Sequence, residues 1–319
     1  MIDPVRPIAI EDIEAARKRI AGTVLRTPLV KLELGDGAPD IRLKLENLQP
    51  TNAYKIRGGA NAVAALSDEA RAQGVWTISA GNAGQGVAYA ARAFGIPCTV
   101  VAIETAPQTK LDRMRALGAK IVPVSYDRAW VAAETHEFPG LNATFVHPFD
   151  NHDFIAGHAT MGLEILEDCP DAATVICAIG GGGLITGVGS AIKAKKPDTK
   201  VIGAEPETAA PFALSLREGE PRKYEAWEAS FVDGAGGKSV TERMWQRMRP
   251  VTDGAITVTL EQTADAMRLI AEKTRAIAEG AGALSLAAAL SGEQLDGPII
   301  CVVSGGNIDL DKFAELVSE

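Results

Sequence analysis

The sequence predicts an α/β protein with mostly parallel sheets that are covered by helices on both faces. Short apolar runs alternate along most of the chain with amphipathic or alanine-rich stretches. Apolar runs of this length are typical of buried parallel strands, and their alternation with helices is typical of βαβ units. Three of the runs also lead into small polar residues, and such sheets bind ligands at the carboxyl ends of their strands.

The individual elements follow from this pattern. The segment 41–45 alternates apolar and basic residues, as a strand does, whereas 174–179 is almost entirely apolar, as a fully buried strand would be. Strands are expected at 41–45, 75–79, 98–103, 120–124, 144–147, 174–179, 202–205 and 299–303. Helices are expected at 12–20, in the alanine-rich stretch after Lys55, at 87–94, 108–117, 129–136 and 154–168, and from about Leu184. We expect a small domain at 49–150 and a large domain formed by 1–48 and 151–319.

Composition narrows the class of protein. The chain has 319 residues, of which 46% are hydrophobic and 23% charged, as in a soluble globular protein of one or two domains. The net charge of -9 argues against a nucleic-acid surface or a polybasic membrane anchor. No apolar run is long enough to span a membrane, and the first residues lack the layout of a secretion signal. We therefore expect a cytoplasmic protein.

The cysteines and histidines do not predict a metal site. Four widely spaced cysteines form no CxxC pair, which favours buried free thiols in a reducing compartment. Four histidines show no HExxH spacing. These residues are Cys98, Cys169, Cys177 and Cys301, and His136, His147, His152 and His158.

Lys55 is the first candidate catalytic residue. It follows the aromatic Tyr54 and opens the predicted alanine-rich helix. Apolar packing and the positive end of a helix both disfavour a charged ammonium group, so the amine can lose its proton more easily there. A neutral lysine amine is a nucleophile that can bond covalently to an aldehyde.

Three predicted strands lead into glycine-rich polar loops, at 79–86, 180–183 and 304–307. In the second, four consecutive glycines precede a helix, an arrangement in which backbone N–H groups can bind a phosphate. The sequence lacks the lysine of an ATP-binding loop and lacks GxGxxG in its first strand-turn-helix unit, so a single compact phosphate fits best. A nucleophilic lysine, a phosphate loop and polar strand ends together match the needs of pyridoxal 5'-phosphate.

The chain resembles the threonine/serine dehydratase group of fold-type II pyridoxal-phosphate enzymes, which includes serine racemase. The resemblance covers nearly the whole length, and its motifs are Thr27-Pro28-Leu29, Leu45-Glu46-Asn47-Leu48-Gln49-Pro50, Tyr54-Lys55-Ile56-Arg57-Gly58 and Ser304-Gly305-Gly306-Asn307. It implies a tryptophan synthase β-like fold with two open, twisted, parallel-sheet lobes. It also implies a homo-oligomer, most simply a dimer.

The resemblance also implies a role for individual residues. Lys55 matches the lysine that binds the cofactor covalently and later acts as the base at Cα, and Tyr54 matches the aromatic residue beside the cofactor ring. Asn82 matches the partner of the phenolic oxygen, and Ser304 matches the hydroxyl that faces the pyridine nitrogen. The phosphate loop corresponds to Gly180, Gly181, Gly182, Gly183 and Leu184, and the substrate site to Ser79, Ala80, Gly81, Asn82, Ala83 and His158.

Several positions depart from the family pattern. Asn52-Ala53 stands where the family has Gly-Ser, and Ala83 replaces a histidine. Ala80 stands where racemases have a serine, which favours elimination over racemisation. His158 replaces a common glutamine, and two interpretations remain open: it contacts the substrate, or it caps a helix.

The group's divalent-metal site is also incomplete, because Pro211 occupies the place of its aspartate six residues after Glu205. No metal is therefore assigned. The residues after Asn307 leave no length for a regulatory domain, so feedback by isoleucine is not expected.

The function predicted from the sequence is pyridoxal-phosphate-dependent β-elimination, which converts a β-hydroxy-α-amino acid such as threonine, serine, phenylserine or hydroxyaspartate into a 2-oxo acid and ammonia. The departures near the lysine favour a substrate other than threonine, with an aryl or acidic side chain. Two alternatives remain: a racemase or β-replacement enzyme on the same scaffold, and a non-catalytic amino-acid-binding relative.

Overall fold

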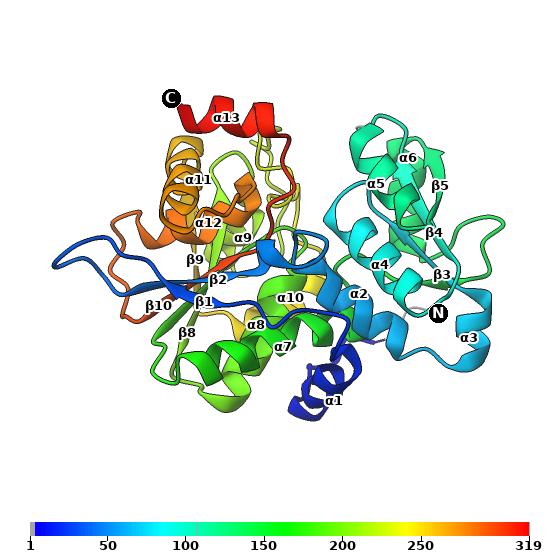
Figure 1. The fold of residues 1–319 in the computed structure, drawn as a ribbon, viewed down its shortest axis with the longest axis horizontal. Coiled ribbons are helices and arrows are strands. Elements are labelled where there is room, and N and C mark those ends of the chain that lie inside the picture. Colours follow the sequence, from blue (N-terminus) through cyan, green and yellow to red (C-terminus); the bar gives the residue numbers. More distant parts are fainter. Residues whose placement is uncertain (1–3, 107, 319) are drawn as a thin grey trace.

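The chain folds around two separate β-sheets, as seen in a computed structural model that describes residues 4–106 and 108–318 (Figure 1). The larger sheet has six strands in the order β1-β2-β10-β7-β8-β9, and the smaller has four in the order β5-β4-β3-β6. The strands are β1 (Leu29–Lys31), β2 (Ile41–Leu45), β3 (Val75–Ile78), β4 (Cys98–Ile103), β5 (Lys120–Val124), β6 (Thr144–Phe145), β7 (Thr174–Ala178), β8 (Lys200–Pro206), β9 (Gly254–Val258) and β10 (Ile299–Val303).

Parallel pairing dominates both sheets, which confirms the predicted fold class. In the described part of the chain every strand pair is parallel except β1 with β2. Parallel neighbours align their carboxyl ends, so the loops after β3, β7 and β10 each leave a sheet at its ligand-binding edge.

Helices cover both faces of the smaller sheet, which lies at the right of Figure 1. Successive residues of β4 point to opposite faces, so Val100 packs with α4 (Asn82–Ala93) and α5 (Gln108–Ala116), and Val101 packs with α6 (Tyr126–Thr135). This alternation explains why β4 is apolar on both faces.

The larger sheet has the same layered arrangement. Ile176 packs in a cluster with residues of α11 (Leu260–Thr274) and α12 (Gly280–Ala289). Its neighbours Val175 and Cys177 pack in another cluster with α7 (His152–Asp168) and α8 (Gly183–Lys195). Apart from α2 (Lys55–Ala64), the other helices of the described chain are α1 (Ile10–Ile20), α3 (Asp68–Gln73), α9 (Pro211–Glu218), α10 (Glu242–Met248) and α13 (Leu310–Ser318), with short 3-10 turns at Glu46–Leu48 and Arg249–Val251.

Helix α2 (Lys55–Ala64) packs between the two layered units, against α4 on one side and α7 on the other. Glycines make both approaches possible. A Cβ on Gly86 of α4 would lie 2.8 Å from the carbonyl carbon of Lys55, and a Cβ on Gly157 of α7 would overlap the Arg57 carbonyl. The expected domain boundaries at 49 and 150 remain a prediction, since α2 contacts both units.

One helix begins well before its expected start. We expected residues 79–86 to form a loop before a helix at 87–94, but α4 begins at Asn82. Gly84 lies inside this helix and serves close packing: a Cβ on Gly84 would lie 2.5 Å from the Ser79 carbonyl oxygen. A glycine-rich segment can therefore be helical where a neighbour presses against it.

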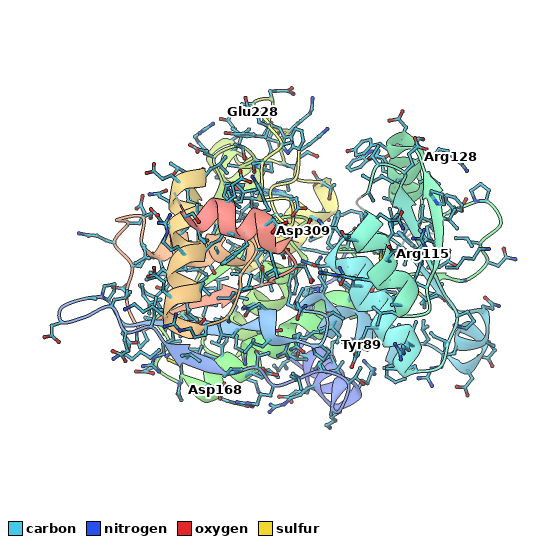
Figure 2. The ribbon with its side chains drawn as sticks, turned by 45° about the horizontal axis from the view of Figure 1, so that its top comes forward. Tyr89, Arg115, Arg128, Asp168, Glu228 and Asp309 are labelled. Carbon is cyan, nitrogen blue, oxygen red and sulfur yellow. The ribbon has the colours of Figure 1, made fainter. Side chains whose placement is uncertain are left out.

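The surface and interior agree with the composition. Charged side chains such as Arg115, Arg128 and Glu228 are exposed (Figure 2). All four cysteines are buried and free, as the sequence predicted. Within 4–106 and 108–318, no helix combines the length and apolarity needed to cross a bilayer.

Candidate active site

Lys55 is the first residue of α2, and its amine lies in a mostly apolar environment. The Nζ atom is 5.2 Å from the ring centroid of Tyr54 and 5.5 Å from that of Phe154, and it donates a hydrogen bond to the Pro148 carbonyl oxygen at 2.7 Å. The Lys55 residue is half-buried, and the protein atoms packed around its amine keep most water away from it. This desolvation lowers the pKa of Lys55 to about 7. A substantial fraction of the amine is therefore neutral and nucleophilic at neutral pH.

The four glycines connect β7 to α8, as expected. Gly182 has a φ of 85°, which side chains rarely adopt, and a Cβ there would overlap Met248. A Cβ on Gly181 would overlap the Phe149 ring. Gly183 begins α8, and Leu184 is buried in its first turn. The loop thus presents backbone N–H groups at the positive end of a 13-residue helix.

Asn82 begins α4 and belongs to a buried polar cluster that spans three separate segments. Its Nδ2 donates to Glu279 Oε1 at 2.6 Å, and its Oδ1 accepts from Asn307 Nδ2 at 2.8 Å. Glu279 was not predicted from the sequence. Burial raises its pKa to about 7, and repulsion from Asp233 adds to the shift. No local motif marks this glutamate; only its position directly before α12 could have suggested a helix-terminal role.

Ser304 directly follows β10 and lies beside the first turn of α2. Its hydroxyl donates to the Ala281 carbonyl oxygen at 3.2 Å, and its own carbonyl accepts from the Tyr54 N–H at 3.0 Å. The structure therefore brings Ser304 next to the Tyr54–Lys55 pair.

The expected substrate loop occupies the turn between β3 and α4. Ser79 Oγ accepts from the Gly81 N–H at 3.1 Å, and Gly81 is the residue before α4. Ala83 is buried, whereas Ala80 is partly exposed.

His158 is fully buried in the middle of α7, so the interpretation that it caps a helix is wrong. Asn151 caps α7 instead, by accepting from the Phe154 N–H at 2.8 Å. The imidazole lies edge-on to Tyr54 and Phe154, with ring centroids 4.6 and 4.7 Å away, and neither ring nitrogen has a hydrogen-bond partner among the described residues. Burial, with repulsion from Lys55 and Arg57, lowers the pKa of His158 well below its usual value. The neutral ring therefore supports the two aromatic residues that flank Lys55.

Glu205 has a structural role in α9. Its carboxylate accepts from the N–H groups of Phe212 and Ala213 at 3.0 and 2.7 Å, and Pro211 is the first residue of that helix. Burial raises the pKa of Glu205 to about 7. Among the described residues, no three His, Cys, Asp or Glu side chains are grouped as metal ligands.

A buried ionic cluster forms around Arg57 of α2. The fully buried Arg57 guanidinium bonds to both Glu46 and Glu164 at 2.7–2.8 Å. Lys44 also pairs with Glu164, and Thr27 donates to Glu46. Several of these residues stand in the family motifs, but their ion pairs could not be predicted from the sequence. The partners lie up to 120 residues apart, and such distant pairing leaves no local pattern.

These residues fit pyridoxal phosphate. One region of the fold brings together the Lys55 amine, the backbone N–H groups of the loop 180–183 and the polar residues Asn82 and Ser304. Side chains at Gly181 and Gly182 would crowd the loop, as expected if backbone groups must approach a ligand closely. The fold and the site together define a pyridoxal-phosphate-dependent enzyme.

Comparison with known proteins identifies the same class of enzyme. Residues 20–305 match the family model described as "Pyridoxal-phosphate dependent enzyme", and the chain belongs to this family. It is 40% identical to an L-threonine ammonia-lyase of Thermotoga maritima, over 98% of this chain and 79% of that protein.

Solved structures show the same similarity. Maize serine racemase superposes with a TM-score of 0.88 at 33% identity, covering 98% of this chain and 97% of the other. The T.th. threonine deaminase gives a TM-score of 0.88 at 36% identity, covering 94% of this chain and 99% of the other.

Proposed function

We propose that this protein converts a β-hydroxy-α-amino acid into a 2-oxo acid and ammonia, with pyridoxal phosphate as cofactor. The observation that carries the proposal is the Lys55 amine, whose pKa is lowered to about 7 by burial at the start of α2. The similarity to an L-threonine ammonia-lyase and a threonine deaminase supports the same reaction class.

Each group of residues has a distinct task in this proposal. The Lys55 amine holds the cofactor aldehyde covalently, and the glycines 180–183 and Leu184 bind its phosphate through backbone N–H groups. Asn82 donates to the phenolic oxygen, and Glu279 and Asn307 orient it through the bonds described above. Ser304 faces the ring nitrogen, and Tyr54 packs beside the ring. When bound, the cofactor withdraws electrons from the substrate Cα.

The proton transfers use few side chains. Once freed by the substrate, the Lys55 amine would take the Cα proton, and with this proton the Cβ hydroxyl would leave as water. The unsaturated amino acid then takes up water at Cα and releases ammonia, which balances the reaction. The substrate carboxylate binds the turn formed by Ser79, Ala80, Gly81, Asn82 and Ala83, which lies at the amino end of α4. His158 supports Tyr54 from behind.

Racemisation is the second candidate, because maize serine racemase shares the fold at 33% identity. A racemase needs a proton donor on the face opposite the lysine. Ala80 and Ala83 carry no proton that they can donate, so we favour elimination.

The test is product analysis with the cofactor-loaded enzyme and a panel of threonine, serine, phenylserine and hydroxyaspartate. We expect ammonia and 2-oxo acid in equal amounts, and no product from Lys55→Ala. Lys18→Ala, at an exposed lysine of α1, is the control and should retain activity. Accumulation of D-amino acid without ammonia would favour the racemase, and turnover by Lys55→Ala would contradict the mechanism.

We also propose a homodimer in the cytoplasm and a small domain bounded by residues 49 and 150, on the resemblance to the family. Light scattering that gives the mass of one chain would contradict the dimer.

A further inference from the structure

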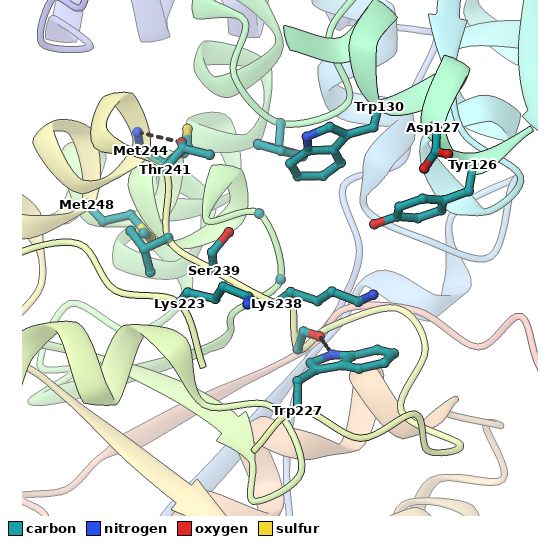
Figure 3. A pocket seen from close by; sticks show the side chains of 16 residues that line it. Tyr126, Asp127, Trp130, Lys223, Trp227, Lys238, Ser239, Thr241, Met244 and Met248 are labelled. Atoms are coloured by element: carbon teal, nitrogen blue, oxygen red, sulfur yellow. Dashed lines mark hydrogen bonds between the residues drawn. The ribbon is translucent and has the colours of Figure 1, made fainter. Parts of the chain in front are cut away.

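A pocket of about 610 Å³ borders the glycine loop and has predominantly aromatic and apolar walls (Figure 3). Tyr126 and Trp130 extend from α6 on one side, and Trp227 lies on the opposite side, in the loop between α9 and α10. The Tyr126 and Trp130 side chains are 52% and 45% exposed. Large aromatic side chains that face water in a concave site are available to cover an apolar ligand.

A lysine lies between two of these rings. The Lys238 Nζ atom is 4.5 Å from the centroid of Trp227 and 5.4 Å from that of Tyr126. Within the described chain, no carboxylate lies within salt-bridge distance of this amine. A cation held over ring faces is attracted to a further aromatic ring as well. The neighbouring Lys223 differs, because it pairs with Glu225 at 3.1 Å.

The pocket is connected to the proposed catalytic lysine through two consecutive residues. The Pro148 carbonyl accepts the hydrogen bond from Lys55 Nζ. The next residue, Phe149, lines the pocket and packs against Gly181 of the phosphate loop. The pocket therefore adjoins the segment that the Lys55 amine contacts.

We propose that this pocket receives the substrate side chain, and that the enzyme prefers β-hydroxy-α-amino acids with an aromatic ring on Cβ. The inference deepens the proposed function and rests on it. A threonine methyl group would leave Trp130 and Tyr126 in water, whereas an aryl ring covers them and meets the Lys238 cation. An acidic side chain would pair with Lys238 but would be placed among Trp130, Met244 and Met248.

The experiment compares kcat/KM of the cofactor-loaded enzyme for phenylserine, threonine and hydroxyaspartate. We expect phenylserine to be the best substrate. Trp130→Ala should raise KM for phenylserine about tenfold, while kcat/KM for threonine stays within about twofold. Tyr126→Leu, at a second exposed wall residue, should act in the same direction.

Val131→Ala is the matched control. Val131 is the next residue on α6 and is 56% exposed, but it does not line this pocket. It should leave all three substrates unaffected. The visible absorbance of the bound cofactor, measured for every variant, separates a loss of side-chain binding from a loss of cofactor.

The outcomes separate the two proposals. Threonine far ahead of phenylserine, or equal effects of Trp130→Ala on both, would overturn the aryl preference and leave the elimination reaction intact. Hydroxyaspartate as the best substrate, with activity lost in Lys238→Met, would assign the pocket to an acidic side chain instead. No turnover of any β-hydroxy amino acid would contradict both the aryl preference and the proposed function.

Discussion

At the scale of single residues, the account depends on the proton of Lys55. Burial lowers its pKa from 10.5 to about 7, so the folded protein loses this proton far more readily than the unfolded chain does. The apo-protein should bind pyridoxal phosphate at a rate that rises with pH through about 7 and then levels off. Stopped-flow absorbance measures this rate. A rate that keeps rising to pH 10, as it does for free lysine derivatives, would show that the pKa of the reacting amine is not lowered.

Glu279 gives a second prediction at this scale. Its pKa is raised from 4.5 to about 7, so the folded state binds the proton more tightly. The stability that this provides is complete below pH 4.5 and is lost as pH rises through about 7. Glu279→Gln keeps an acceptor for Asn82 and removes this dependence. Urea denaturation of the apo-protein measures the free energy of unfolding. As pH rises from 5 to 8, this free energy should increase for the variant relative to the wild type. A difference that does not change with pH would refute the assignment.

The sequence predicts some site residues and not others for a physical reason. Lys55, Ser304 and the glycine loop stand in local motifs whose chemistry is visible in their neighbours. Glu279 reaches Asn82 across 197 residues, and only the tertiary fold brings the two together. His158 was visible in the sequence as a departure from the family pattern, but its burial against the Tyr54 ring was not.

At the scale of elements, close helix packing decides where glycine is required. Gly86 of α4 contacts the first turn of α2, and Gly86→Ala would place a Cβ 2.8 Å from the Lys55 carbonyl carbon. The helices must separate, so we expect about 1–3 kcal/mol lower stability and weaker cofactor binding. Calorimetry and cofactor titration measure both effects.

Gly254→Ala is the control, because its Cβ would lie at an ordinary 3.6 Å from Ile202. Gly86→Ala with unchanged cofactor affinity and stability would contradict the packing argument. The wrong boundary of α4 has the same cause: isolated glycines favour a loop in the sequence, and only the neighbouring α2 explains a helix.

Across the whole fold, Arg57 connects α2 to Glu46, which directly follows β2, and to Glu164 of α7. Arg57→Met would leave buried carboxylates with fewer partners, so we expect a loss of about 3–5 kcal/mol. Arg222→Met removes an exposed pair with Glu220 and should cost about 1 kcal/mol or less. Urea denaturation compares the two variants. Equal losses would mean that burial of the cluster is not what stabilises α2.

The two-sheet architecture was only partly predictable. Alternation of strands and helices is a local pattern, and it gave the α/β class and most strand positions. The pairing of β2 with β10 joins residues more than 250 positions apart and leaves no such pattern. The position of α2 between the two units likewise depends on Gly86 and Gly157, whose partners lie far away in the sequence.

The proposed mechanism requires that one amine, Lys55, holds the cofactor. The most direct measurement adds pyridoxal phosphate to the purified protein, reduces with borohydride and maps the modified peptide by mass spectrometry. The account predicts a visible absorbance band before reduction and a single modified lysine, at position 55. A colourless protein, or a modification on another lysine in place of Lys55, would contradict it.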